Sequence, residues 1–529
     1  MLLLQRKIKH PGLFDFVILV GFWGLLAVQM QGFSDDPGVG WHIKTGEFVY
    51  RNFSVPRVDP FLAGPQREWV ADQWLSDLLL YLCYQTGGFQ LLYLLLTILF
   101  ALTFFLILYA NCVKTSCGFL GSALAVLLTF KLSQLHFILR PVVFSFFFFA
   151  VVFGLMYRVS HELFQSSSEE QVQKIKNNFL SLPVLFILWA NMHPSFVLGL
   201  IVVFAAAAGT LVDKYIFNES AALSDIAIKR LFLLALTCAA VTLVNPYFWG
   251  LHWSIFELGH SSFFMKFHME WLSPDFKSFE GMLLEVMLAV IGVALLIRSG
   301  GPRPVNGFEL LVVVFFVHSA FFAVRMLPYC SMVLTPLAAR CLYLYGDLPL
   351  FSELKIFKRV KRAFCWLEDL ENSSARGRIG TFVAISVIGG FYFFGNAMPF
   401  YHGPYGPPAK KFPYKAIEFI KSQLNSGESV AVMSPPEWGG FITMFGEGRL
   451  RAVIDDRNTL LGEKFYKDYF KYLTPLEDWE GYCRRLGVKR ILLKREHLLA
   501  RFIKKFHLEL VAYSDELAVV IKVPEAVGI

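Results

Sequence analysis

Long apolar runs separated by short polar loops make up most of the chain as far as residue 397. A helix needs about 20 apolar residues to cross the roughly 30 Å hydrocarbon core of a bilayer, and several runs reach that length. The first run is too long for the apolar part of a signal peptide, and no small-residue cleavage site follows it, so we expect it to be retained. The pattern predicts about eleven transmembrane helices, near residues 13–31, 89–110, 118–131, 142–158, 179–192, 195–212, 230–248, 281–298, 307–324, 327–345 and 380–397.

Residues 398–529 have a different pattern. Short apolar runs (SVAVM, RAVID, RILLK, LELVAY and LAVVIKV) alternate with stretches of helical spacing, such as PYKAIEFIKSQL. This alternation predicts a small α/β domain. The stretch SPPEWGG lacks the repeated glycines of a dinucleotide-binding loop, and we interpret it as a structural turn. The chain is therefore expected to contain a transmembrane domain, residues 1–397, and a C-terminal α/β domain, residues 398–529.

The composition agrees with a membrane protein. A soluble protein carries about 25% charged residues, whereas this chain of 529 residues has 17% charged and 56% hydrophobic residues and a mean hydropathy of +0.52. These values predict an α-helical polytopic membrane protein. The net charge of +8 does not indicate a nucleic-acid partner, because the basic residues cluster beside the predicted membrane helices. None of the eight cysteines forms a C-x-x-C pair, so we interpret them as small apolar residues.

Lysine and arginine are distributed unevenly between alternate loops, and this bias orients the chain. With the basic N-terminus MLLLQRKIKH in the cytoplasm, the densest basic cluster, KIFKRVKR at 355–362, also falls inside. The loop 33–88 then faces outward, and so does the C-terminal domain, since it follows an odd number of spans. In a bacterium the protein would lie in the inner membrane with this domain in the periplasm. The other outward segments are HFILRP (136–141), NMHPS (191–195), residues 249–280 and Arg325.

An acidic pair, Asp35 and Asp36, stands where the first apolar run ends. One interpretation is structural, because Asp36 followed by Pro37 is a favoured helix start, with aspartate as N-cap and proline at the first helical position. The stretch VGWHIKTGEFVYRN would then be an amphipathic helix along the membrane surface, with Trp41 at the level of the lipid headgroups. A cap needs only one aspartate, which leaves the second without a structural purpose.

The other interpretation of the acidic pair is chemical. An outward carboxylate at the membrane surface can take the proton of an acceptor hydroxyl when a sugar is transferred from a polyprenyl phosphate. Phosphate departs as a stable anion, so cations or hydrogen-bond donors must hold it. Asp36 is the favoured base because it stands nearer to Trp41 and His42, and Asp35 is the alternative if Asp36 caps the helix.

Further polar residues of the outward segments are candidates for substrate binding. Arg140 precedes a proline at a helix entrance, where an arginine either reaches the headgroups or clamps a phosphate, and His136 would share its helix face. Polar groups in the tight turn NMHPS are costly unless they face protein or water. We interpret residues 249–280, rich in Phe and Trp, as a cover over the site, and His268 and Glu270 there fit no metal-binding motif. The candidates are His42, His136, Arg140, Asn191, His193 and Arg325.

Several stretches carry a resemblance to known proteins. DDPGVGWHIKTGEFVYRNFSVPRVDPF, followed by REWVADQWL, is similar to a group of bacterial membrane proteins, and the similarity continues through HFILRP, WANMHPSFVLG, VNPYFWGLH, VRMLPYCSMVLTP and WGGFITMFGEGRLRAVIDDRN. The architecture, with an acidic residue in the first outward loop, many spans and a C-terminal extracytoplasmic domain, resembles the GT-C-type integral membrane glycosyltransferases. The resemblance implies a polyprenyl-phosphate-linked sugar as donor and places the catalytic acid at Asp35 or Asp36.

Together these features predict a glycosyltransferase that acts at the outer surface of the membrane. Its partners would be the lipid bilayer, a polyprenyl-phosphate-linked sugar and an envelope glycan, lipid or protein as acceptor. No cofactor is predicted, and a divalent metal ion stays open as an alternative. Another class of function also stays open, that of a non-catalytic transporter, an export component or a membrane scaffold of envelope glycan assembly.

Overall fold

The computed structural model describes residues 30–112, 119–163, 181–217, 224–297, 305–346 and 403–524, together with a few isolated residues between these ranges. Apolar helices fall on the predicted spans within these ranges. Four of them are long and apolar enough to cross a membrane, namely Trp74–Leu106, Val142–Leu163, Phe196–Ile216 and Phe279–Leu296. The protein is therefore an integral membrane protein. The total of about eleven spans stays a prediction, and the predicted span 380–397 lies outside the described residues.

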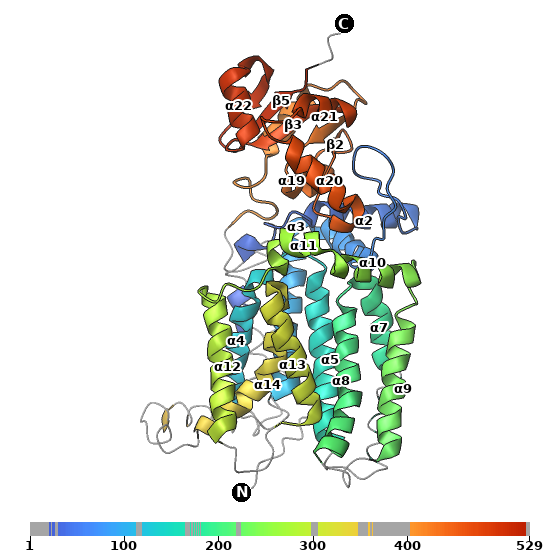
Figure 1. The fold of residues 1–529 in the computed structure, drawn as a ribbon, viewed down its shortest axis with the longest axis vertical. Coiled ribbons are helices and arrows are strands. Elements are labelled where there is room, and N and C mark those ends of the chain that lie inside the picture. The colour runs from blue at the N-terminus through green and yellow to red at the C-terminus, as the bar shows by residue number, and fades with distance from the viewer. Residues whose placement is uncertain are drawn as a thin grey trace.

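The helices form an upright bundle around a core rich in Phe, Leu and Val (Figure 1). Long uncharged stretches form these helices because only a helix satisfies all backbone polar groups of a single segment in lipid. The bundle consists of α3 (Trp74–Leu106), α4 (Phe119–Ser133), α5 (Val142–Leu163), α7 (Ser181–Met192), α8 (Phe196–Leu211), α9 (Asp225–Val241), α12 (Phe279–Ile297), α13 (Gly307–Phe322) and α14 (Leu327–Gly346).

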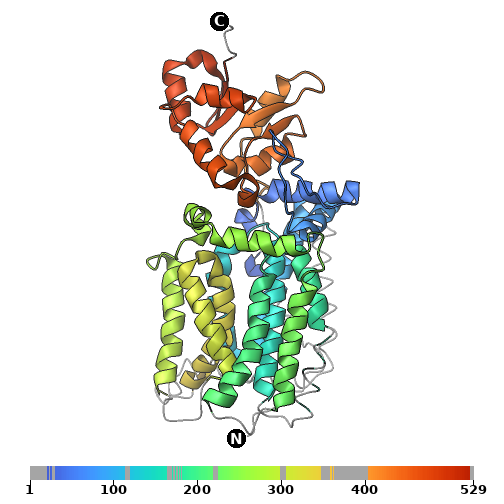
Figure 2. The same cartoon turned by 45° about the vertical axis from the view of Figure 1, so that its right-hand side comes forward.

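A layer of shorter helices covers one end of the bundle. It contains α2 (Val39–Asn52), the first part of α3, α10 (Trp249–His260) and α11 (Ser262–Phe267) (Figure 2). Helix α3 enters the bundle through a kink at Gly87 and Gly88, where Gly88 has a φ of +59° that side chains rarely adopt. The segments predicted to face outward thus gather at one end of the bundle. Which side of the membrane this end faces stays a prediction.

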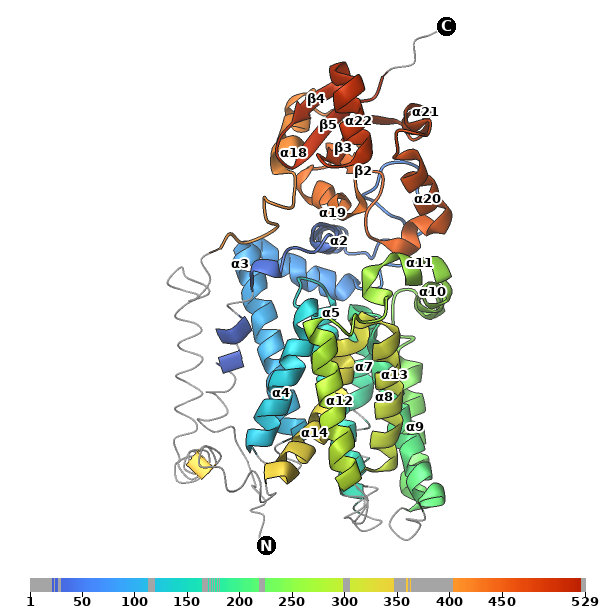
Figure 3. The ribbon, with the colours of Figure 1, turned by 60° about the vertical axis from the view of Figure 1, so that its left-hand side comes forward.

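The C-terminal residues 403–524 form an α/β unit on top of this layer (Figure 3). Its five strands are β1 (Val430–Met433), β2 (Leu450–Ala452), β3 (Val488–Lys494), β4 (Val511–Ser514) and β5 (Ala518–Lys522), in the order β2-β1-β3-β5-β4. Strand β1 is parallel to β2 and β3, while β5 is antiparallel to β3 and β4. The helices are α18 (Tyr414–Ser422), α19 (Pro436–Phe445), α20 (Asn458–Tyr472), α21 (Trp479–Arg485) and α22 (Leu498–Phe506).

The stretch SPPEWGG is not only a turn, as the sequence suggested, but leads into helix α19. This helix crosses α2 at two glycines, since a Cβ on Gly40 would lie 1.9 Å from the carbonyl oxygen of Gly440. The close approach of the two backbones is therefore possible only without side chains at this crossing. It brings the C-terminal unit into contact with the first loop.

The first loop also packs into the core of the C-terminal unit. Leu62 and Trp69 belong to the same buried cluster as the strands β1 and β3, and the backbone N–H of Ala63 donates to the carbonyl of Ala452 on β2 at 2.8 Å. Two parts of the chain almost 400 residues apart thus share one core. This shared core holds the end of β2 directly above the helix bundle.

Candidate functional site

The structure separates the two aspartates of the acidic pair. Asp36 is 7% exposed, and its Oδ1 accepts a hydrogen bond from the backbone N–H of Gly38 at 2.8 Å. Helix α2 begins at Val39, with Gly38 as its N-cap, so Asp36 fixes the turn before the helix and is not the predicted N-cap. Asp35 lies at the surface, where its carboxylate pairs with Lys411 at 2.6 Å. The buried aspartate is therefore the stronger candidate for chemistry.

Arg140 is the centre of a cluster of carboxylates from three distant segments. Its Nε lies 2.5 Å from Asp36 Oδ2, its Nη2 lies 3.1 Å from Asp456 Oδ2, and its Nη1 lies 4.0 Å from Glu270 Oε2. Asp36 comes from the first loop, Asp456 from the end of β2, and Glu270 from the segment between α11 and α12. Asp456 Oδ1 also accepts a hydrogen bond from Trp41 Nε1 at 2.8 Å. The cluster joins all three layers of the molecule.

Arg325 extends the cluster through Glu270. Its Nη1 lies 3.5 Å from Glu270 Oε1, and its guanidinium carbon lies 4.2 Å from the ring centre of Trp271. Residues 249–280 were predicted to cover the site, and they contribute this carboxylate to it. Two arginines thus face one glutamate at the end of the bundle.

Burial and charge shift the acidity of this cluster. Burial raises the pKa of Asp36 even though Arg140 opposes it, and burial raises the pKa of Asp456 to about 7. Burial would also raise the pKa of Glu270, but Arg325 and Arg140 outweigh it and lower the value to about 2. The carboxylates in turn raise the pKa of Arg140 despite its burial. The cluster therefore holds two permanent cations beside two carboxyl groups that take up protons more readily than usual.

Three predicted histidines lie near these charges as neutral side chains. Burial lowers the pKa of His193 to about 3 and that of His136 to about 4, and it lowers the pKa of His42 well below its usual value. His193 Nδ1 accepts a hydrogen bond from the backbone N–H of Ser195 at 3.1 Å, so the proton of the neutral ring sits on Nε2. The Nδ1 atom of His136 is buried without a hydrogen-bond partner among the described residues. The site thus contains neutral hydrogen-bonding groups next to its arginines.

Asn191 lies in the last turn of α7, directly before the turn at residues 193–195. Its Oδ1 accepts from Trp74 Nε1 at 3.0 Å, and its Nδ2 donates to the carbonyls of Ile187 and Val244 at 2.8 Å each. The amide therefore ties α3, α7 and the end of α9 together. A role of Asn191 in substrate binding stays a prediction. Arg140 and Arg325 belong to the acidic cluster through their ion pairs, and the charges of that cluster act on the pKa values of His42, His136 and His193.

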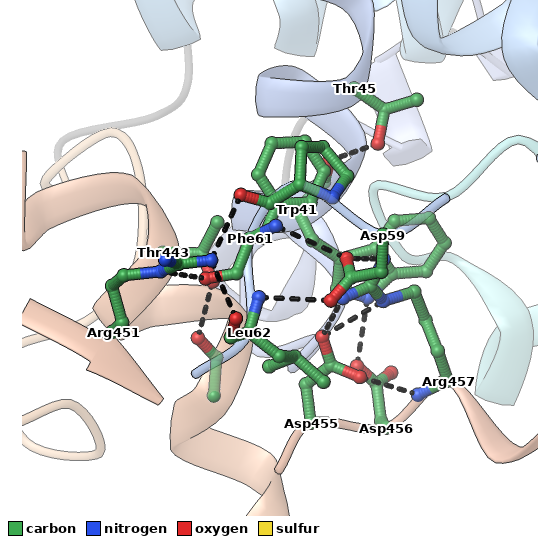
Figure 4. A network of polar contacts seen from close by, with 12 residues as sticks. Trp41, Thr45, Asp59, Phe61, Leu62, Thr443, Arg451, Asp455, Asp456 and Arg457 are labelled. Carbon is green, nitrogen blue, oxygen red and sulfur yellow. Dashed lines mark hydrogen bonds and ion pairs between the residues drawn. The ribbon is translucent and has the colours of Figure 1, made fainter. Parts of the chain in front are cut away.

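The C-terminal unit supplies charged residues to the candidate site that the sequence did not reveal. Figure 4 shows Asp455, Asp456 and Arg457, which lie between β2 and α20, facing the first loop. Arg457 pairs with Asp455 at 2.6 Å and with Asp59 of the first loop at 2.9 Å, and it lies 4.5 Å from the ring centre of Trp69. The only signal in the sequence is the run DDR at the end of a predicted strand, where parallel sheets place their sites.

The described residues contain no group of three or more His, Cys, Asp or Glu side chains placed to hold a metal ion. In the Arg140 cluster, a guanidinium group lies between the three carboxylates.

Comparisons with known proteins identify the fold. No protein-family model matches the chain, and no curated protein matches it. The solved structures similar to it include the apo oligosaccharyltransferase of Archaeoglobus fulgidus, at 12% identity and a TM-score of 0.56, covering 93% of this chain and 70% of that one. They also include AglB of that organism with an inhibitory peptide and a dolichol-phosphate, at 12% identity and a TM-score of 0.55, covering 91% of this chain and 69% of that one. The same enzyme tethered to an acceptor peptide with the NVT sequon has 13% identity, a TM-score of 0.57 and the same coverage.

The sequence resemblance to GT-C-type membrane glycosyltransferases is confirmed at the level of the fold. At 12 to 13% identity the comparison identifies an architecture. The activity must be argued from the site itself.

Proposed function

We propose that the protein is a membrane glycosyltransferase that moves a sugar from a polyprenyl-phosphate donor to an acceptor at the outer face of the bacterial inner membrane. The fold supports the reaction class, and a solved neighbour binds a dolichol-phosphate, which is itself a polyprenyl phosphate. The excess of basic residues in the predicted inner loops supports the orientation. The acceptor would be a glycan, lipid or protein of the cell envelope.

The observation that carries the proposal is the ion pair between buried Asp36 and half-buried Arg140 at the end of the helix bundle. A donor lipid in the bilayer would present its phosphate at the end of the helix bundle, at the level of this ion pair. Arginine binds carboxylate and phosphate oxygens with the same geometry, so a phosphate can take the place of a carboxylate on Arg140. Asp36 would then be free beside the reacting sugar. Its raised pKa makes it a stronger base than an exposed aspartate.

The remaining groups suit the departure of a phosphate. Arg325 supplies a second cation, and the Nε2–H of neutral His193 supplies a hydrogen-bond donor. His136 and His42 add two further neutral imidazole groups, which feel the charge of Arg140. Groups of this kind stabilise the charge that collects on the phosphate when the bond to the sugar breaks. Asp36 takes the proton of the acceptor, so one displacement with inversion at the sugar carbon completes the transfer.

The proposal is tested by release of free polyprenyl phosphate from a panel of lipid-linked sugars, in the presence of crude envelope acceptor. Wild type is compared with Asp36→Asn and with the matched control Asp35→Asn, which removes the same charge one residue away. We expect wild type and Asp35→Asn to release polyprenyl phosphate at similar rates, and Asp36→Asn to lose about 100-fold or more.

Two results would contradict the proposal. If Asp36→Asn is as active as wild type, the base lies elsewhere. If wild type releases nothing across a broad panel, the transporter, export or scaffold function gains support. The thermal unfolding of each variant is measured alongside, so that loss of structure is not counted as loss of chemistry.

A further inference from the structure

His42 and Asp77 form a buried pair beside the Arg140 cluster. His42 on α2 is 2% exposed, Asp77 in the first turn of α3 is 1% exposed, and His42 Nδ1 lies 2.6 Å from Asp77 Oδ1. The backbones of the two helices touch at this level, because a Cβ on Gly46 would lie 2.0 Å from the carbonyl oxygen of Asp77. Backbone packing therefore fixes the distance between the two side chains.

Burial determines how many protons this pair holds. Among the described residues, His42 is the only ionisable partner within ion-pairing distance of Asp77. A lone carboxylate at this depth would be strongly disfavoured, so the pair keeps a proton between Oδ1 and Nδ1 and is neutral overall. A neutral imidazole whose Nδ1 is engaged in this way carries its own hydrogen on Nε2. That Nε2–H makes no hydrogen bond with any residue that the structure describes, and it is not among the fully enclosed polar atoms.

The surroundings of His42 indicate what this free donor faces. Trp41, the residue before His42, donates its Nε1–H to Asp456 Oδ1 at 2.8 Å, and Asp456 pairs with Arg140 at 3.1 Å, so His42 lies next to the Arg140 cluster. Besides burial, the charges of Arg140, His193 and Arg457 lower the pKa of His42. Arg140 and His193 are groups that the proposed function assigns to the donor phosphate. A phosphate on Arg140 would reverse the sign of the local field and would favour the imidazolium form of His42.

We propose that Asp77 is a positioning residue that holds His42 with its Nε2–H directed to the leaving phosphate. This inference rests on the proposed function. When the bond between the sugar carbon and the phosphate oxygen breaks, the electron pair goes to that oxygen and the proton of the acceptor goes to Asp36. The phosphate changes from a diester with one charge to a monoester whose second pKa is about 6, so it gains charge during the step.

The His42–Asp77 pair stabilises this additional negative charge on the phosphate when a proton shifts within the pair. As negative charge develops on the phosphate, the hydrogen bond from Nε2 strengthens, and the shared proton moves from Asp77 to Nδ1. An imidazolium then faces the phosphate, and a carboxylate stabilises it from behind. No proton or electron is taken from outside the pair.

The test measures kcat and KM for the lipid donor in full-length protein with Asp77→Asn, His42→Gln and the double variant. We expect each single variant to lose about 100-fold in kcat with little change in KM, because the contact strengthens only in the transition state. The double variant should be no slower than the slower single variant, because Asp77 acts only through His42. Asp77→Glu keeps the carboxyl group and should recover part of the rate.

The control is Asp35→Asn, which changes a carboxyl group that pairs with Lys411 and not with His42. Its kcat should stay within about threefold of the wild-type value. Loss of a positioned acid or base has a much larger effect on kcat. A purely structural role of Asp77 would make the effects of the two substitutions multiply, which would overturn the inference, as would a normal kcat of Asp77→Asn. If Asp36→Asn is inactive while Asp77→Asn is normal, this inference fails and the proposed function stands. If wild type itself releases no polyprenyl phosphate, the proposed function fails.

Discussion

Replacement of Gly40 by alanine tests how the C-terminal unit docks on the first loop. A Cβ at this position would lie 1.9 Å from the carbonyl oxygen of Gly440, whereas a carbon–oxygen contact needs about 3.3 Å. Helices α2 and α19 must therefore separate by about 1.4 Å at the crossing. Trp41 is the next residue, and its Nε1 donates to Asp456 over 2.8 Å. The same displacement stretches this bond beyond the roughly 3.2 Å limit of a normal N–H···O hydrogen bond.

The cost of the substitution has two parts. Overpacking costs about 1 to 3 kcal/mol, and loss of a hydrogen bond to a charged group costs about 1.5 to 3 kcal/mol. The lower ends of both ranges together give about 2.5 kcal/mol against the docked arrangement. This corresponds to an undocked population about 60-fold larger than in wild type.

Amide hydrogen exchange of the full-length protein in lipid nanodiscs measures this population. The N–H of Ala63 is the reporter, because it bonds to Ala452 across the interface. We expect it to exchange about 60-fold faster in Gly40→Ala, while the amides of α5 keep their protection. The control is Gly259→Ala, since this glycine lies in helix α10 and a Cβ added to it would meet nothing within 4 Å. Unchanged exchange at Ala63 in Gly40→Ala would refute the docking described above.

Two further predictions concern the residues that follow β2. Arg457→Met should destabilise the docked fold by about 3 to 5 kcal/mol, because it leaves the buried carboxylates of Asp59 and Asp455 without their partner. Its thermal unfolding is compared with that of exposed Arg501→Met, and similar midpoints would contradict the prediction. The pKa of Asp456 is raised from 3.8 to about 7, so its contribution to stability is complete below pH 3.8 and is lost as the pH rises through 7. Protection of the docking interface should therefore fall between pH 3.8 and about pH 7 in wild type and change less in Asp456→Asn.

Local patterns in the sequence were enough to predict the elements that form this fold. The stretch from Val39 to Asn52 is a helix as its amphipathic spacing predicted, and the strand RILLK lies within β3. The loops that hold His136, Arg140, His193 and Arg325 gather at one end of the bundle, because helices that cross a layer place alternate loops on the same side. The stretch SPPEWGG was predicted only as a turn, and it leads into a helix for a local reason, since Pro436 occupies the first position of that helix, where proline is favoured.

The composition of the site was decided by tertiary structure. Local sequence left the roles of Asp35 and Asp36 open, and only the fold buries one against Arg140 and leaves the other with Lys411. The partners of Arg140 are separated by more than 400 residues, from Asp36 to Asp456. A side chain acquires its partner, its burial and its proton affinity from segments that local spacing does not relate. The sequence by itself therefore determined the membrane helices, the α/β unit and the side chains available, whereas docking of that unit on the first loop decided which of them meet.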